Sequence, residues 1–241
     1  MFDREHHERI RKILEGLNVD LMIEAGAFFA GGTALVMMLG EYRESVDIDF
    51  MCSISGPGWR ALRSAFYKDR FRAIFPDKRV WEIDQLQSDQ YGIRGAVGVD
   101  SARHVKFEIV AEARVDLTGY MHPVLGVPVL DPLSMFVQKL CANVDRSIDT
   151  AFTHRDILDI LFMEQHWGPI PEDAFKIAET HYGDTVRLAY ERSLDEISSR
   201  MRLEECCTAM EISDETREKF VDQLGDRYRD DLMDYLKRND W

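Results

Sequence analysis

The sequence predicts an α/β (α+β) fold, in which a domain built around a sheet is followed by a helical C-terminal domain. In the first half, short β-like runs separated by turns alternate with helical segments. From Asp131 onward the apolar residues recur at helical spacing. We therefore expect two domains, residues 1–130 and residues 131–241, which suits a chain of 241 residues.

The bulk composition is typical of a reduced, cytoplasmic protein. Hydrophobic residues make up 45% of the chain, enough to bury a core. Apolar runs stay well short of the roughly 18 residues needed to span a membrane. The N-terminus, MFDREHHERIRK, is charged from its start and does not resemble a secretory signal. Four cysteines without regular spacing predict neither a disulfide framework nor a zinc site.

The charge of the chain is strongly negative but unevenly distributed. A net charge of −14 argues against a protein that coats nucleic acid, which would present a basic face. Residues 60–79, however, contain seven Lys and Arg residues against two Asp residues. This basic stretch would either receive a polyanionic acceptor such as tRNA or form a solvated helix face.

The N-terminal segment predicts two helices that lead into a strand. Helical apolar spacing covers residues 5–17, and a second helix over residues 21–26 precedes the apolar run 27–30. His6 and His7 adjoin on the first helix. Because neighbouring helical residues do not share a face, we expect both at the surface rather than on a metal.

The stretch that organises the chain, residues 28–51, reads FFAGGTALVMMLGEYRESVDIDFM. Its length and punctuation predict a strand, a glycine turn, a short helix, a loop and a second strand. Gly31 and Gly32 would let backbone N–H groups approach an anion closely where the helix begins. Thr33 can cap that helix or offer its hydroxyl to a phosphate.

The second strand of this stretch carries two carboxylates. Residues two apart on a strand point to the same face, so Asp47 and Asp49 would project together. Two such carboxylates repel each other unless a cation lies between them, and Mg²⁺ prefers carboxylate and phosphate oxygens. A phosphate-binding turn followed by paired carboxylates predicts metal-assisted nucleotidyl or phosphoryl transfer.

A helix over residues 59–72 and then several strands are expected after this point. The β-like runs cover residues 79–85, 91–97, 104–111 and 127–130. Glu108 lies in the middle of the third run, between Phe107 and Ile109, where an acidic residue is unusual unless it faces solvent or a site. Glu108 is therefore either part of the site or a solvent-facing residue paired with Lys106 or another neighbour.

The C-terminal half reads as a series of helices. Asp131 is expected to cap the first, with Pro132 at its first position and Lys139 beside its apolar stripe. The next helix, from about residue 154, would place Asp156 and Asp159 on one face. Further helices are expected over residues 172–181, 184–200 and 214–237.

Several of these residues together resemble a known signature. Gly31-Gly32-Thr33, followed by Gly40, Arg43, Ser45 and Asp47-Ile48-Asp49, resembles the motif of the DNA polymerase beta-like nucleotidyltransferases. Within that superfamily, the chain is most similar to the AbiEii/AbiGii-type toxin family. The segments QKLCANVDR and HRDILDIL resemble later motifs of the family. The resemblance covers roughly residues 25–165 and implies a nucleotidyltransferase domain with a mixed sheet.

The resemblance also implies an activity and a set of site residues. The enzyme would transfer NMP from an NTP, its co-substrate, using two Mg²⁺ ions. The implied metal ligands are Asp47, Asp49 and Glu108, with Glu112 and Asp116 as substitutes for Glu108. The implied catalytic residues are these three ligands and Lys139. The implied nucleotide-binding residues are Gly31, Gly32, Thr33, Arg43, Ser45, Lys139 and Asp156.

The acceptor and the partners follow from the same resemblance. A toxin or phage-defence enzyme of this kind would act on tRNA, at its 3′ end, or on a protein side chain, and would have an antitoxin partner. An antibiotic-modifying nucleotidyltransferase is the enzymatic alternative, although those enzymes more often carry Trp at the position of Thr33 and His near Ser45. A non-catalytic nucleotide-sensing module of the same fold is the other alternative.

Overall fold

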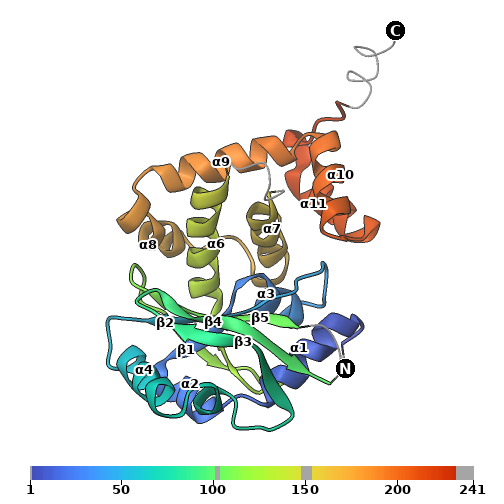
Figure 1. Cartoon of the computed structure of the whole chain (residues 1–241). Coiled ribbons are helices and arrows are strands. Elements are labelled where there is room, and N and C mark those ends of the chain that lie inside the picture. Colours follow the sequence, from blue (N-terminus) through green and yellow to red (C-terminus); the bar gives the residue numbers. More distant parts are fainter. Residues whose placement is uncertain (1, 101–103, 148–153, 232–241) are drawn as a thin grey trace. The chain divides into compact units, whose positions relative to one another are not determined.

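The computed structural model describes residues 2–100, 104–147 and 154–231 (Figure 1). The chain forms two compact units. The first consists of Met1–Glu41 and Ser45–Met135, and the second consists of Tyr42–Glu44 and Phe136–Trp241. The three residues Tyr42–Glu44 therefore belong to the second unit, although the residues on both sides of them in the sequence belong to the first.

The first unit contains a mixed seven-stranded sheet. Its strands are β1 (Ala27–Ala30), β2 (Ile48–Ser53), β3 (Val80–Ser88), β4 (Gly92–Val99), β5 (Val105–Glu112), β6 (Gly119–Met121) and β7 (Pro128–Leu130). Their order across the sheet is β3-β4-β5-β2-β1-β7-β6. The pairs β2–β5 and β1–β7 are parallel, and the other neighbours are antiparallel. The α/β fold with a mixed sheet is confirmed, whereas the edge strand β6 was not expected.

Five helices accompany this sheet. They are α1 (Glu5–Glu15), α2 (Val19–Ala25), α3 (Gly31–Met38), α4 (Gly58–Asp69) and α5 (Phe71–Ile74). Figure 1 shows α2 and α4 together on one side of the sheet. The cap of α2 is Asn18, whose side chain accepts a hydrogen bond from the backbone N–H of Leu21. The expected helix 59–72 is interrupted, because Arg70 adopts φ 52° and cannot continue α4.

Aromatic side chains form the core between the sheet and its helices. Phe29, Phe50 and Phe107 lie on the adjacent strands β1, β2 and β5 and are fully buried. Their ring centroids are 5.4 Å apart between Phe29 and Phe50, and 6.1 Å apart between Phe50 and Phe107. Phe75, directly after α5, packs on Phe107 at 4.9 Å. Because side chains alternate along a strand, the residues next to these phenylalanines point to the opposite face of the sheet.

The second unit is helical. It contains most of α6 (Pro132–Arg146), which begins in the first unit, followed by α7 (Arg155–Trp167), α8 (Glu172–Tyr182), α9 (Thr185–Ile197), α10 (Arg200–Ala209), α11 (Asp214–Leu224) and the 3₁₀ helix η2 (Gly225–Arg227). At the start of α6, Asp131 Oδ1 accepts a 2.8 Å hydrogen bond from the Ser134 N–H, as expected of a cap. Within the described residues, no helix combines the length and apolar character needed to cross a bilayer.

Two of the expected helices of this unit end earlier than the sequence suggested. Instead of one helix over residues 184–200, α9 ends at Ile197 and α10 starts anew, with the Ser199 side chain as its N-cap. The helix expected over residues 214–237 ends before Gly225, which has φ 51°. Residues 232–237 of that expected helix lie outside the described residues.

Candidate functional site

The register of the sheet brings two of the expected carboxylates side by side. Asp49 on β2 and Glu108 on β5 are direct partners in the parallel pairing. The same row continues through Arg94 on β4 and, on the other side, through Ala30 on β1. Adjacent strands lie about 4.8 Å apart, and directly opposed residues face the same side of a sheet. Asp49 and Glu108 therefore share the face opposite the phenylalanine core.

Asp47 was expected on the same strand as Asp49. It lies instead in the loop directly before β2. Its charge nevertheless acts on the same surroundings, as the neighbouring Lys106 shows. Partial burial opposes protonation of Lys106, but the charges of Glu108, Asp49 and Asp47 outweigh it and raise the pKa of the lysine. All three carboxylates thus lie near enough to Lys106 to favour its charged form.

Two basic side chains accompany Glu108. Its carboxylate lies 3.3 Å from Lys106 Nζ and 3.4 Å from Arg94 Nε. Arg94 Nε is buried, and it makes no hydrogen bond to any described residue. Lys106 could be anticipated from its spacing to Glu108, since residues two apart share a strand face. Arg94 could not, because only the register of β4 against β5 brings it opposite Glu108.

Gly31 begins α3 at the end of β1 and lies against Asp49. It has φ 73°, and a Cβ at this position would lie 3.0 Å from Asp49 Oδ2. A side chain is therefore disfavoured both by the backbone conformation and by the nearby carboxylate. Gly31, Gly32 and Thr33 form the first turn of the helix, rather than a turn before it. N–H groups in the first turn have no intrahelical partner, so this helix end could bind an anion beside Asp49.

Thr33 connects the helix to the loop that precedes Asp47. Its hydroxyl does not cap α3 but donates a 2.8 Å hydrogen bond to Ser45 Oγ. Thr33 is buried, whereas Ser45 is partly exposed. As the acceptor in this pair, the Ser45 hydroxyl keeps its own proton for a further partner, such as a phosphate oxygen.

Two histidines of α1 hold the same loop. His7 is fully buried, so the expectation of a surface position was wrong for this residue. Its Nδ1 lies 2.7 Å from Glu41 Oε1, and its Nε2 lies 3.1 Å from the Ser45 carbonyl oxygen. His6 reaches the next residue, with Nε2 2.8 Å from the carbonyl oxygen of Val46. The pair thereby fixes the backbone that leads into Asp47.

We expect the burial of His7 to make the first unit sensitive to mild acid. Burial lowers the pKa of His7, and the neighbouring Glu41 only partly offsets this effect. The unfolded chain therefore binds the proton more readily, so the stabilisation is complete above about pH 6.5 and is lost as pH falls below it. Between pH 7 and pH 5, His7→Gln should lose less stability than the wild type in urea unfolding.

The exposed His181 supplies the control for this experiment. His181→Gln should follow the wild type across the same pH range. If wild type and His7→Gln lost stability in parallel, His7 would not be the group responsible.

In the second unit, four further residues that the sequence analysis singled out form a buried network of ion pairs. Arg43 binds Asp159 through two hydrogen bonds, Nε to Oδ1 at 2.7 Å and Nη2 to Oδ2 at 2.8 Å. Lys139 Nζ lies 2.5 Å from Asp159 Oδ2 and 3.1 Å from Asp156 Oδ1. All four residues are at most 6% exposed. Asp159, to which the sequence assigned no role, is the centre of this network.

The network is completed by Arg146 and Tyr42. Arg146 binds both oxygens of Asp156, at 2.7 and 2.8 Å, and the Tyr42 hydroxyl donates to Asp159. Burial alone would raise the pKa of Asp159, but the charges of Arg43 and Lys139 outweigh it and lower the pKa. Nucleotide binding by Arg43, Lys139 and Asp156 stays a prediction, since each side chain already has a partner in this network.

The carboxylates of the first unit have the donor chemistry that a divalent cation requires. Mg²⁺ is bound through one or two carboxylates together with substrate phosphates, and Asp49 and Glu108 are adjacent. Among the described residues, no three His, Cys, Asp or Glu side chains are already grouped as a metal site. A cation would thus replace Lys106 and Arg94 as the counter-charge of Glu108. The residues present fit a metal whose remaining ligands come from the substrate.

Glu112 and Asp116, the two alternatives to Glu108 as the third carboxylate, lie in less suitable positions. Glu112 lies opposite Ser53, four residues further along β2 than Asp49. At about 3.3 Å per residue, this places Glu112 some 13 Å from the row of Asp49. Asp116 is beyond the end of β5, where it accepts a 2.9 Å hydrogen bond from Ser55. The register therefore favours Glu108 as the third carboxylate.

Comparison with known proteins places this site in context. A family model described as "Nucleotidyl transferase AbiEii toxin, Type IV TA system" matches residues 12–234. Two solved Helicobacter pylori structures share the fold. JHP933 is 17% identical, with a TM-score of 0.53 over 99% of this chain and 98% of its own. A "putative nucleotidyltransferase" is 18% identical, with a TM-score of 0.50 over 98% and 96%. Among curated proteins, none is significantly similar to this chain.

Proposed function

Since the chain belongs to the AbiEii family of nucleotidyl transferase toxins of type IV toxin–antitoxin systems, we propose that it transfers NMP from an NTP to an acceptor hydroxyl with the help of Mg²⁺. One observation supports this proposal above the others. Asp49 and Glu108 are adjacent in the sheet, and Gly31, at the N-terminus of α3, lies directly against Asp49. Carboxylates that can bind a cation therefore lie next to backbone N–H groups that can bind a phosphate.

In this reaction the acceptor hydroxyl oxygen attacks the α-phosphorus of the NTP. A new oxygen–phosphorus bond forms, the bond from the α-phosphorus to the bridging oxygen breaks, and pyrophosphate leaves with that oxygen. One of the carboxylates accepts the hydroxyl proton. Mg²⁺, held by Asp49 and Glu108 with Asp47 nearby, would supply phosphate neutralisation and a lower pKa of the hydroxyl. Such reactions depend mainly on positioning and charge stabilisation.

The remaining residues of this region would bind the triphosphate. The first-turn N–H groups of α3 and the Ser45 hydroxyl would donate to phosphate oxygens. Arg94 and Lys106 are paired with Glu108 at 3.3–3.4 Å. Once Glu108 binds a cation, both basic side chains could turn to the phosphates and stabilise the departing pyrophosphate. We assign the charge-stabilising role to them, while the role of Lys139 stays the expectation from the family resemblance.

The acceptor proposed here is an RNA end, such as the 3′ end of tRNA. The family's description as a toxin–antitoxin system also supports an antitoxin protein as a partner.

Label transfer tests the activity and the acceptor together. The protein is incubated with Mg²⁺, each α-labelled NTP in turn, total tRNA and bulk protein extract. We expect one nucleotide to label the tRNA band, and the label to disappear when EDTA removes the metal. A labelled protein band would show that the acceptor is a protein side chain rather than RNA. Nucleotide binding without any labelled product would contradict a transferase and favour a nucleotide-sensing module.

A further inference from the structure

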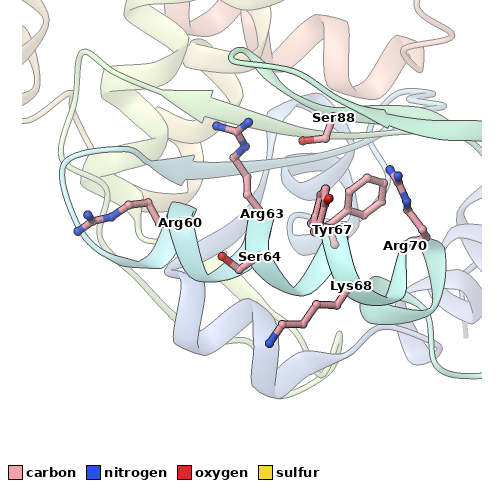
Figure 2. Close-up of a pocket in the computed structure, with 8 residues that line it drawn as sticks. Arg60, Arg63, Ser64, Tyr67, Lys68, Arg70 and Ser88 are labelled. Carbon is pink, nitrogen blue, oxygen red and sulfur yellow. The ribbon is translucent and has the colours of Figure 1, made fainter.

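A basic pocket lies in the first unit, between α4 and the end of β3. Its volume is about 520 Å³ (Figure 2). Its lining includes four basic side chains, Arg60, Arg63, Lys68 and Arg70, together with Tyr67 and Ser88. Figure 2 shows Arg63 and Arg70 on either side of Tyr67 and directed toward the strand that carries Ser88, whereas Arg60 and Lys68 lie at the margins.

The cations of this pocket are not neutralised by the protein. Among the described residues, no carboxylate lies within ion-pair distance of Arg60, Arg63, Lys68 or Arg70. Some exposed cations elsewhere do have such partners: Lys176, Arg187 and Lys219 are each within 3.0 Å of a carboxylate oxygen. Four unpaired positive charges repel one another unless an anion binds between them. In a chain of net charge −14, their concentration at one pocket indicates a polyanionic ligand.

Tyr67 gives this pocket a second property. Tyr67 is 78% exposed, the largest exposed fraction among the big apolar residues that the structure describes. The Arg70 guanidinium lies 5.9 Å from the centre of the Tyr67 ring. An exposed ring between two arginines can stack a nucleic-acid base while the arginines bind the flanking phosphates.

The backbone of Arg70 supports a role for its side chain. Arg70 has φ 52° and ψ −136°, a conformation in which glycine is favoured and other residues are strained. This conformation ends α4 and directs the next chain segment into α5. With this backbone, the Arg70 guanidinium lies beside the Tyr67 ring.

The pocket lies at the edge strand nearest the proposed site. Ser88 is the last residue of β3, and its neighbour Gln87 is opposite Arg94. From Gln87 the row runs through Arg94 and Glu108 to Asp49. Three strand spacings separate Gln87 from Asp49, which is about 14 Å. Ser88 is in the neighbouring row, which faces the other side of the sheet, because side chains alternate along a strand. A strand of nucleic acid bound at the pocket would therefore pass around the edge of β3 to present its end to the carboxylates.

We propose that this pocket binds a single-stranded segment of the RNA acceptor, with a base on Tyr67 and its phosphodiester groups on Arg63 and Arg70. The acceptor role rests on the proposed function, whereas the binding itself does not. The pocket hydroxyls, including that of Ser88, offer partners to the ribose 2′-OH, which distinguishes RNA from DNA.

Fluorescence anisotropy with a labelled, unstructured 12-nucleotide RNA tests the binding, in EDTA and without NTP so that no transfer can occur. The main variant is Arg63→Ala/Arg70→Gly, in which glycine relieves the strain at position 70. We expect this variant to bind the RNA at least tenfold more weakly. The logarithm of the binding constant decreases with the logarithm of the salt concentration. This slope should become less steep by roughly 1.4, because two phosphate contacts, each contributing about 0.7, are lost.

Two further variants complete this test. Tyr67→Ala should weaken binding at least fivefold through the loss of stacking. The charge-matched control, Lys176→Ala/Lys219→Ala, removes two paired cations elsewhere and should change binding less than twofold. Equal RNA binding by all variants would overturn the proposal, as would equal affinity for DNA of the same sequence or full competition by GTP.

The outcomes also separate this proposal from the proposed function. If pocket variants lose RNA binding but the wild type never labels RNA, the transferase assignment fails and the binding site stands. If the wild type labels RNA and the pocket variants bind and label it equally well, the pocket assignment alone is wrong.

Discussion

Asp49→Asn is expected to lower nucleotidyl transfer on the order of a thousandfold, which corresponds to about 4 kcal/mol of lost transition-state stabilisation. Asp49 is the carboxylate that lies both beside Glu108 and against Gly31. An amide at this position keeps the shape of the side chain but removes the charge that a cation requires. Label transfer at saturating NTP and Mg²⁺ measures the loss.

The fold should survive this substitution. Asp49, Asp47 and Glu108 repel one another, so removing one charge relieves repulsion while weakening the attraction for Lys106. We expect the free energy of unfolding to change by less than about 1 kcal/mol. The charge-matched control is Asp116→Asn, since Asp116 is exposed and bonded to Ser55. Full turnover by folded Asp49→Asn would remove this residue from the site.

The same assay decides which glutamate is the third carboxylate. Glu108→Gln should lose activity as severely as Asp49→Asn. Glu112→Gln should keep the activity where the protein folds, because Glu112 is the last residue of β5 and lies opposite Ser53, at the far end of β2 from Asp49. The reverse result would show that the register argument chose the wrong residue.

The sequence could predict those features of this site that depend on residues close together in the chain. Gly31, Gly32 and Asp49 lie within twenty residues of one another, and their order predicts strand, helix and strand without any knowledge of distant contacts. The position of Glu108 in mid-strand was also visible, because an acidic residue between two buried apolar neighbours stands out.

What the sequence could not predict depends on contacts between distant segments. Arg94 faces Glu108 only because of the register of two antiparallel strands. His7 is buried because α1 packs on the loop of Ser45, and no local pattern reveals this contact. The break at Arg70 contradicts helix propensity, since arginine is a good helix former, so local reasoning extended the helix through it.

Asp159 is the clearest example of such a distant contact. Its spacing from Asp156 suggested only a shared helix face, and the partner segment Tyr42–Glu44 is more than one hundred residues away. Removing the buried carboxylate of Asp159 leaves Arg43 without its carboxylate partner, and leaves Lys139 with Asp156 alone. The large effect of its loss is therefore a property of the fold, independent of any role in the reaction.

We expect Asp159→Asn to destabilise the second unit by about 3–5 kcal/mol, the usual cost of leaving buried charges unpaired. The cations lose their common acceptor, and the amide presents a donor where the Arg43 guanidinium already donates. Urea unfolding followed by circular dichroism measures this change. Asp173→Asn, which removes an exposed carboxylate paired with Lys176, should cost less than about 1 kcal/mol.

The dependence on pH provides an independent check of the same network. The pKa of Asp159 is lowered in the folded state, so its contribution is present above the ordinary value near 3.8 and is lost as pH falls below it. Asp159→Asn lacks this group and should lose less stability than the wild type between pH 5 and pH 2. If Asp159→Asn stayed within 1 kcal/mol of the wild type at pH 7 and showed the same acid profile, the ion network would not stabilise this unit. Lys139 would then be free to serve a nucleotide instead.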